Sequence, residues 1–142
     1  MYQINEGRFT VPAGFEDKST TVLQGVGGDK QLSLTVIRDV LEENEGINEY
    51  VVRQLGELKK RLPGYKMLGK KSAFLGGAKT AIEGIQIESR YKYNKSEVFQ
   101  RQAGFIVNDK KVLVLTLTRS LPFEEQAELC WQDLLSGFEL RT

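Results

Sequence analysis

The sequence predicts an α+β fold in which a twisted antiparallel β-sheet is packed with two main α-helices. Short segments of alternating apolar and polar residues, bounded by turn residues, fill most of the chain, and this pattern is typical of β-strands. Only two segments have helical periodicity, and they do not alternate with the strands as in a parallel sheet. The length of 142 residues suits one core. We therefore expect a single domain over residues 1–142.

Seven segments alternate in the manner of strands. The connections at 26–30 and 108–110 contain Gly, Asn or Asp, which tolerate the positive φ that tight hairpin turns require. Short hairpins imply antiparallel pairing. The predicted strands are Gln3–Val11, Thr20–Val26, Gln31–Arg38, Tyr65–Phe74, Thr80–Tyr93, Val98–Val107 and Val112–Arg119.

The first predicted helix runs from Ile47 to Leu62 and stops at Pro63-Gly64. Its apolar residues recur every third or fourth position and form one stripe. A helical wheel places Gln54 inside this stripe. Burying an unpaired amide costs about 1–3 kcal/mol, so Gln54 needs a partner in the core or in a ligand.

The second predicted helix starts at Pro122, a residue suited to a first helical turn, and its apolar stripe continues to Phe138. Glu124 and Glu125 lie near the positive end of its dipole. Like the first helix it has one apolar face, so both are expected to pack on the sheet.

Composition excludes several classes of function. Twenty Lys and Arg against 19 Asp and Glu give no field that would attract nucleic acid or an anionic membrane. The chain has no histidine, so the usual general base and zinc ligand are missing, and its one cysteine, Cys130, lies among apolar helix positions. We expect no metal, no cofactor and no catalysis. Without a signal sequence or a membrane span, we expect a cytoplasmic protein that does not insert into membranes.

Several predicted strands have one aliphatic face and one mixed face of β-branched, hydroxyl and amide side chains. In Val98–Val107, Gln100 and Gln102 lie on the mixed face, whereas Arg101 shares the aliphatic one. Mixed faces are ordinary on the solvent side of an antiparallel sheet. They carry few charges, however, and this combination suits a mostly apolar ligand with a few polar atoms, such as a helix made for a membrane.

A set of motifs resembles the Eag-type chaperones of bacterial type VI secretion, which belong to the DcrB-related branch of the PsbP-like fold. The motifs cover nearly the whole chain. They are Asn5-Glu6-Gly7, Pro12-x-Gly14, Asp17-x-Ser19, LSLTVIRD, YVVRQLGEL, RLPGY, LGG, QRQ, VLTLT and a final helix with tryptophan. The resemblance implies a cytosolic homodimer that binds the N-terminal transmembrane segments of a PAAR-containing effector and shields them from water before export.

The resemblance also implies a binding surface for the effector's helices, carried over motif by motif. Most of its residues already lie on the mixed faces or inside the stripe of the first helix. The expected client-binding residues are Thr20, Val22, Ser33, Thr35, Ile37, Gln54, Leu62 and Gln102.

Two other functions fit the sequence less closely. The first is a protein-interaction or regulatory module of the same fold that acts on a soluble partner. The second is an enzyme that uses carboxylates such as Glu83 and Glu88, although no paired arrangement of these side chains can be argued from the sequence. A neighbouring gene for a PAAR protein with N-terminal hydrophobic segments would favour the chaperone.

Overall fold

The computed structural model of the chain describes residues 2–4, 6–15, 19–24, 32–77, 79 and 81–139. Within these ranges the chain forms an antiparallel sheet and two α-helices, which confirms the predicted α+β class. The strands are β1 Tyr2–Ile4, β2 Gly7–Phe9, β3 Thr20–Gln24, β4 Ser33–Val40, β5 Lys66–Leu75, β6 Ile82–Tyr93, β7 Ser96–Asn108 and β8 Lys111–Arg119, and the helices are α1 Ile47–Arg61 and α2 Glu125–Ser136.

Six strands form one sheet in the order β3-β4-β8-β7-β6-β5, and every neighbouring pair is antiparallel. The turn between β6 and β7 places Asn94 and Lys95 at positive φ, as a two-residue hairpin requires. The predicted turn at 108–110 is confirmed between β7 and β8, where Asp109 has φ 48°. The predicted turn at 26–30 lies outside the described residues, as do Val26, Gln31 and Thr80.

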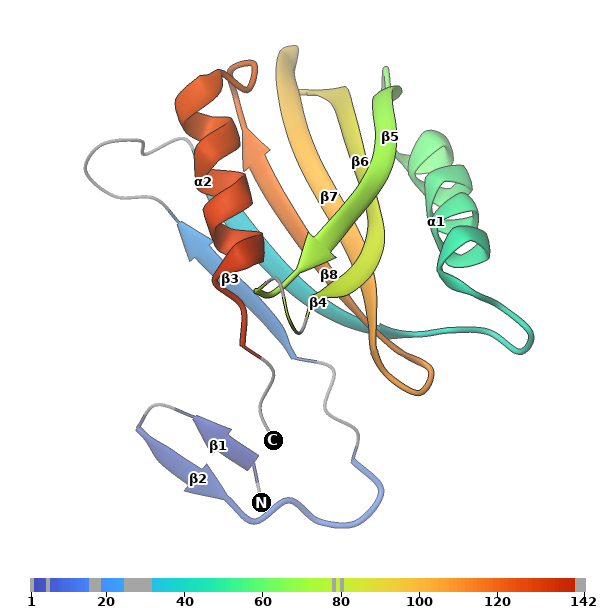
Figure 1. Cartoon of the computed structure of the whole chain (residues 1–142), viewed down its shortest axis with the longest axis vertical. Coiled ribbons are helices and arrows are strands. Elements are labelled where there is room, and N and C mark those ends of the chain that lie inside the picture. Colours follow the sequence, from blue (N-terminus) through green and yellow to red (C-terminus); the bar gives the residue numbers. More distant parts are fainter. Residues whose placement is uncertain are drawn as a thin grey trace.

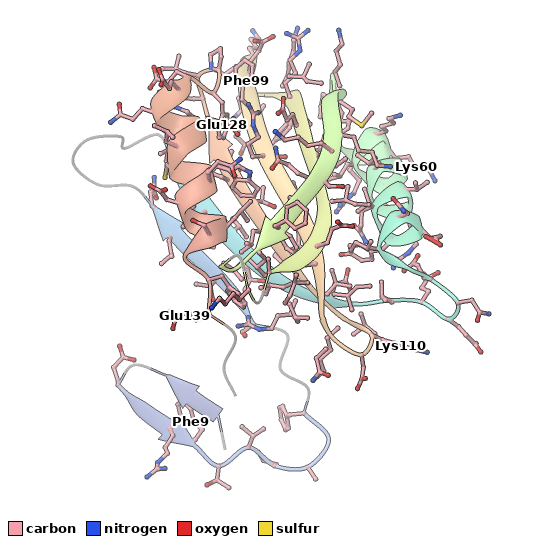
Figure 2. The ribbon with its side chains drawn as sticks, in the orientation of Figure 1. Phe9, Lys60, Phe99, Lys110, Glu128 and Glu139 are labelled. Atoms are coloured by element: carbon pink, nitrogen blue, oxygen red, sulfur yellow. The ribbon has the colours of Figure 1, made fainter. Side chains whose placement is uncertain are left out.

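The prediction of one strand over Gln3–Val11 is wrong. A turn at Glu6 divides this segment into β1 and β2, which pair antiparallel as a separate two-stranded sheet. Figure 1 shows this hairpin apart from the six-stranded sheet. Figure 2 shows the side chain of Phe9 on the hairpin, away from the core, and 58% of it is exposed.

The first helix has the predicted extent, because α1 ends at Arg61 and Leu62 is its C-terminal capping residue. The second helix begins later than predicted, and Pro122 is not part of it. Arg119 donates hydrogen bonds to the Pro122 carbonyl and to the Glu124 carboxylate. Glu124 itself has an extended backbone as the N-cap, so the helix starts only at Glu125.

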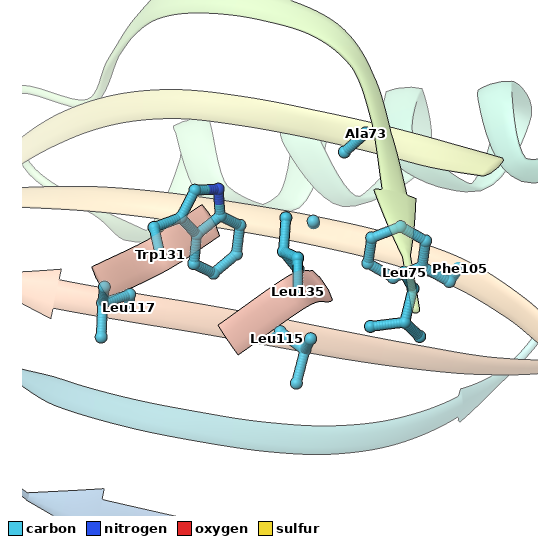
Figure 3. Close-up of a cluster of buried hydrophobic side chains, with 8 residues drawn as sticks. Ala73, Leu75, Phe105, Leu115, Leu117, Trp131 and Leu135 are labelled. Atoms are coloured by element: carbon cyan, nitrogen blue, oxygen red, sulfur yellow. The ribbon is translucent and has the colours of Figure 1, made fainter. Parts of the chain in front are cut away.

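The helix α2 covers one face of the sheet and forms the larger hydrophobic core with it (Figure 1). Trp131 and Phe105 are completely buried at its centre. Figure 3 shows the cluster that they form with side chains from β5, β7, β8 and α2. The Trp131 indole Nε1 donates a hydrogen bond of 2.8 Å to Oε1 of Gln86, a buried amide on β6.

Arg101 holds α2 and the segment before it against the sheet. Its Nε donates a hydrogen bond of 3.0 Å to Glu128 on α2, and Glu88 on β6 lies 3.6 Å away. The guanidinium also stacks over the Phe123 ring, 4.2 Å from its centroid. Arg101, the charged residue on the aliphatic face of β7, therefore has a structural role on the side of the sheet opposite α1.

Candidate functional site

The face of the sheet opposite α2 carries three consecutive rows of side chains that run across five strands. Strand register defines these rows, because residues paired across antiparallel strands lie side by side on one face. The Gln100 row contains Gln24, Ser33, Thr118, Gln100 and Ser89; the Gln102 row contains Val22, Thr35, Thr116, Gln102 and Ile87; and the apolar row contains Thr20, Ile37, Val114, Gly104 and Ile85. None of these residues is charged.

The helix α1 covers only part of this face. Its apolar stripe packs on β6, β7 and β8, where Tyr50 and Val51 contact Ile85, Ile87 and Val114 in a second hydrophobic core. The edge strand β3 lies beyond the helix, and Val22 on this strand is 61% exposed. The open part of the face together with α1 forms a groove, with the strands as its floor and α1 as one wall.

A cavity of about 200 Å³ lies where the wall meets the floor. Two amides reach it from opposite sides, Gln54 from α1 and Gln102 from β7. Apart from Asp39 and Arg61 the rest of the lining is mainly apolar, and Gly104 adds no side chain that would fill the space. The cavity thus combines an aliphatic surface with a few convergent polar groups, which is typical of a binding site.

Each of the two glutamines on β7 forms a pair with a threonine on β8. Gln100 Nε2 donates a hydrogen bond of 3.2 Å to Thr118 Oγ1, and Gln102 Nε2 donates one of 3.2 Å to Thr116 Oγ1. No described residue donates to Oε1 of either glutamine. Each pair therefore presents an amide oxygen as an acceptor and a threonine hydroxyl that has its own hydrogen to donate.

A hydrogen bond between Tyr50 and Asp39 closes the end of the groove at the start of α1. The Tyr50 hydroxyl donates to Asp39 Oδ2 over 2.8 Å, and both residues line the cavity. Burial, together with the neighbouring Asp39 carboxylate, raises the pKa of Tyr50 above its usual value. Tyr50 therefore stays protonated at neutral pH and keeps its hydrogen bond to β4.

The start of α1 is also fixed by an ion pair behind the groove. Arg53 donates hydrogen bonds of 2.8 Å to both carboxylate oxygens of Glu45, and its guanidinium lies 5.2 Å from the centroid of the Tyr50 ring. The bonds from Arg53 lower the pKa of Glu45 from 4.5 to about 2. Glu45 thus stays ionised in acid that would protonate an ordinary glutamate.

We expect this ion pair to make stability depend on pH between about 4.5 and about 2. In this window the unfolded chain binds a proton at Glu45 that the folded chain does not, so stability falls as the pH falls. Urea denaturation at pH 6, 4 and 3 measures the effect. The Glu45→Gln variant should lose less stability over this range than the parent, and equal losses would contradict the assignment.

A family model described as DcrB matches residues 6–137. The chain belongs to the DcrB family. It is also 26% identical over 132 residues to Effector EagT6 of Pseudomonas aeruginosa strain PAO1, a match that covers 89% of this chain and 88% of EagT6. The predicted membership of a DcrB-related, Eag-type family is thereby confirmed.

Two solved structures share the fold of this DcrB-family chain. The crystal structure of PA94 from Pseudomonas aeruginosa, described as a protein of unknown function, has a TM-score of 0.79 at 20% identity and covers 99% of this chain and 96% of PA94. LpqN of Mycobacterium tuberculosis, described as involved in cell envelope biogenesis, has a TM-score of 0.51 at 20% identity, covering 88% of this chain and 85% of LpqN.

The DcrB-family fold brings most of the predicted binding residues onto one surface. Ile37, Gln54 and Gln102 line the cavity. Thr20, Val22, Ser33 and Thr35 do not line it but lie on the same sheet face, in the three rows that cross β3 and β4. Leu62 lies apart from these rows, at the C-terminal end of α1, where its backbone N–H caps the helix.

Sequence reasoning left two threonines of this DcrB-family chain out of the predicted site. Thr116 and Thr118 bind the glutamine side chains of β7, and Thr116 is only 7% exposed. The alternation of residues in β8 had placed both threonines on a mixed face, and this pattern could have identified them as candidates. Their partners became clear only from the pairing of β7 with β8.

The described part of this DcrB-family chain contains no cluster of three His, Cys, Asp or Glu residues that could hold a metal ion. No helix among the described residues is both long enough and apolar enough to span a bilayer. The groove offers apolar contact and hydrogen-bonding groups from the two Gln–Thr pairs.

Proposed function

We propose that this chain is a non-catalytic chaperone that binds the N-terminal transmembrane helices of a PAAR-containing type VI secretion effector and shields them in the cytoplasm before export. The observation that carries this proposal is the three uncharged rows of the sheet face beside α1, which combine aliphatic side chains with two Gln–Thr pairs. The similarity to the protein named Effector EagT6 supports a role in type VI secretion.

A transmembrane helix outside a membrane needs apolar contact and partners for its few polar groups, and the groove provides both. Apolar burial stabilises the complex by roughly 25 cal/mol per Å². A membrane helix also carries hydroxyl and other small polar groups, which in a bilayer are satisfied by neighbouring helices. Gln54, Gln102 and Thr35 would take the place of those neighbours. A surface of charged residues would instead favour a soluble partner.

We further propose that residues 1–142 form one chaperone domain that acts as a homodimer. One sheet face covers only one side of a helix about 10 Å across, so the other side would remain in water. A second copy, placed with its groove toward the first, would cover it. Mass measurement of the purified complex tests this arrangement, with two chaperone chains per client fragment as the expected stoichiometry.

Val22→Glu is expected to abolish capture of the client, because it places a charge on the groove floor that an apolar helix would have to desolvate. The measurement is co-purification with the N-terminal fragment of a PAAR effector encoded near this chain's gene. Val52→Glu is the matched control, since Val52 is 59% exposed against 61% for Val22 but lies on the outer side of α1. We expect Val52→Glu to capture the client like the parent chain.

Gln102→Ala provides a second test with a smaller change in charge and volume. It removes the amide from the groove and should weaken capture strongly while the melting temperature remains close to that of the parent. If both variants retain the client as well as the parent does, the groove is not the binding site. If a soluble fragment of the effector is captured instead of its hydrophobic segments, the protein acts on a soluble partner.

A further inference from the structure

The groove has a defined long axis, because α1 is attached along the length of the strands. Near its start, Tyr50 is hydrogen-bonded to Asp39 on β4. Beyond its end, the Lys92 N–H on β6 donates a hydrogen bond of 2.8 Å to the Pro63 carbonyl. Through the sheet register, Asp39 lies level with Ile106 of β7 and Lys92 level with Glu97, so the helix runs along the strands while it crosses obliquely from β4 to β6. A client helix beside α1 would follow the strands as well.

The Gln100 and Gln102 rows are two residues apart along the same strand. At about 3.4 Å per residue this separates them by roughly 6.8 Å along the groove. A client helix rises about 1.5 Å per residue, so positions i and i+4 are about 6 Å apart on one face, whereas i and i+3 are about 4.5 Å apart. The spacing of the two rows therefore matches i and i+4.

Each row has the same pair of binding groups at the same place. A glutamine oxygen without a described donor and a threonine hydroxyl lie next to each other on β7 and β8. A serine or threonine on the client can donate to the first and accept from the second. Ser33 and Thr35 on β4 continue the two rows toward the open side of the groove.

We propose that the two Gln–Thr pairs select client helices that carry serine or threonine at positions i and i+4 of the face that lies on the sheet. This inference rests on the proposed function and states which transmembrane helices the groove prefers. A helix with its hydroxyls at other spacings aligns with one row at most and leaves the other pair without a partner in a site closed to water.

A competition between two model helices tests the selection. Each is an apolar Leu/Ala helix of about 20 residues fused to a soluble carrier protein. One carries serines at i and i+4, and the other carries the same serines at i and i+2, on opposite faces. Both fusions are co-expressed with limiting chaperone, and the captured ratio is measured by mass spectrometry. We expect roughly tenfold preference for the i, i+4 helix, from two hydrogen bonds of the strength found between membrane helices.

The Gln100→Leu/Gln102→Leu double variant should capture less of both helices and lose the preference between them, since its groove keeps apolar contact but loses both glutamine amides of β7. Gln132→Leu, on the exposed side of α2, is the matched control and should keep the preference. Equal capture of the two helices by the parent chain, or an unchanged preference in the double variant, overturns the selection but leaves the proposed function intact. Failure of the parent to capture any apolar helix overturns both.

Discussion

Gly84→Ala is expected to lower the free energy of unfolding by about 3 kcal/mol, the upper range for overpacking a core. A Cβ at this position would lie 2.2 Å from the Gly104 carbonyl oxygen and 2.4 Å from Cδ1 of Phe105. Neither neighbour can yield easily. The Gly104 carbonyl belongs to β7, which pairs with β6, and Phe105 is completely buried against α2. Urea denaturation of the variant and the parent measures the loss.

Gly56→Ala is the control for this prediction. Gly56 lies on the exposed side of α1, and apart from its chain neighbours and the adjacent helix backbone no atom would lie within 4 Å of its new Cβ. Because alanine is favoured over glycine in a helix by about 1 kcal/mol, this variant should be more stable than the parent. Equal effects at the two positions would mean that the close contact around Gly84 is not a constraint on the fold.

Trp131→Ala is expected to cost about 3–5 kcal/mol, because it empties the centre of the larger core. The indole is completely buried, and its N–H is the described hydrogen-bond partner of the Gln86 side chain. Gln86 Nε2 is buried without a described partner. Loss of the indole would therefore leave the whole amide unsatisfied in an apolar environment. Thermal and urea unfolding both report this effect.

A double-mutant cycle separates the packing of Trp131 from its hydrogen bond. Trp131→Phe keeps an aromatic ring but removes the indole N–H, so the buried Gln86 side chain loses its hydrogen-bond donor. This loss should lower the free energy of unfolding by about 1–3 kcal/mol, in addition to the effect of the smaller ring. Gln86→Leu in the same chain removes the stranded amide and should recover part of that cost. Strictly additive effects of the two substitutions would show that the hydrogen bond contributes little.

The sequence was sufficient for the class of fold and for the two faces of most strands. Alternation placed Gln102 and Thr35 on a mixed face, and the helical wheel placed Gln54 toward the core; the structure has all three in these positions. Both inferences depend only on residues that are close together in the chain. Within one strand or helix, the periodicity of the backbone decides which side each residue faces.

The register of β7 against β8 could not be predicted, and the site depends on it. The hairpin closes with Asn108 opposite Lys111, and uninterrupted pairing from there would place Gln102 opposite Leu117. A bulge between Ile106 and Asn108 shifts the register by one residue and places Gln102 opposite Thr116 instead. Because a one-residue shift reverses the faces that meet, this bulge creates the Gln–Thr pairs.

The start of α2 shows a second limit of prediction. Pro122 is suited to a first helical turn, yet it precedes the helix because Arg119 binds its carbonyl and the Glu124 side chain. Arg119 is buried at the end of β8. A tertiary contact of this kind overrides local preference and leaves no periodic pattern in the sequence.

The attachment of α1 at both ends makes the groove a preorganised site. Its wall is bonded to β4 at one end and to β6 at the other, so the distance between wall and floor is set before a client arrives. Binding then requires little ordering of the chaperone, which favours affinity. It also limits adaptation, since adaptable binding surfaces are typically rich in methionine and this chain has only two. A groove of fixed width and fixed spacing of its polar groups is suited to a dedicated chaperone with few clients. A protein that must accept many unrelated helices would need a groove that changes shape more easily.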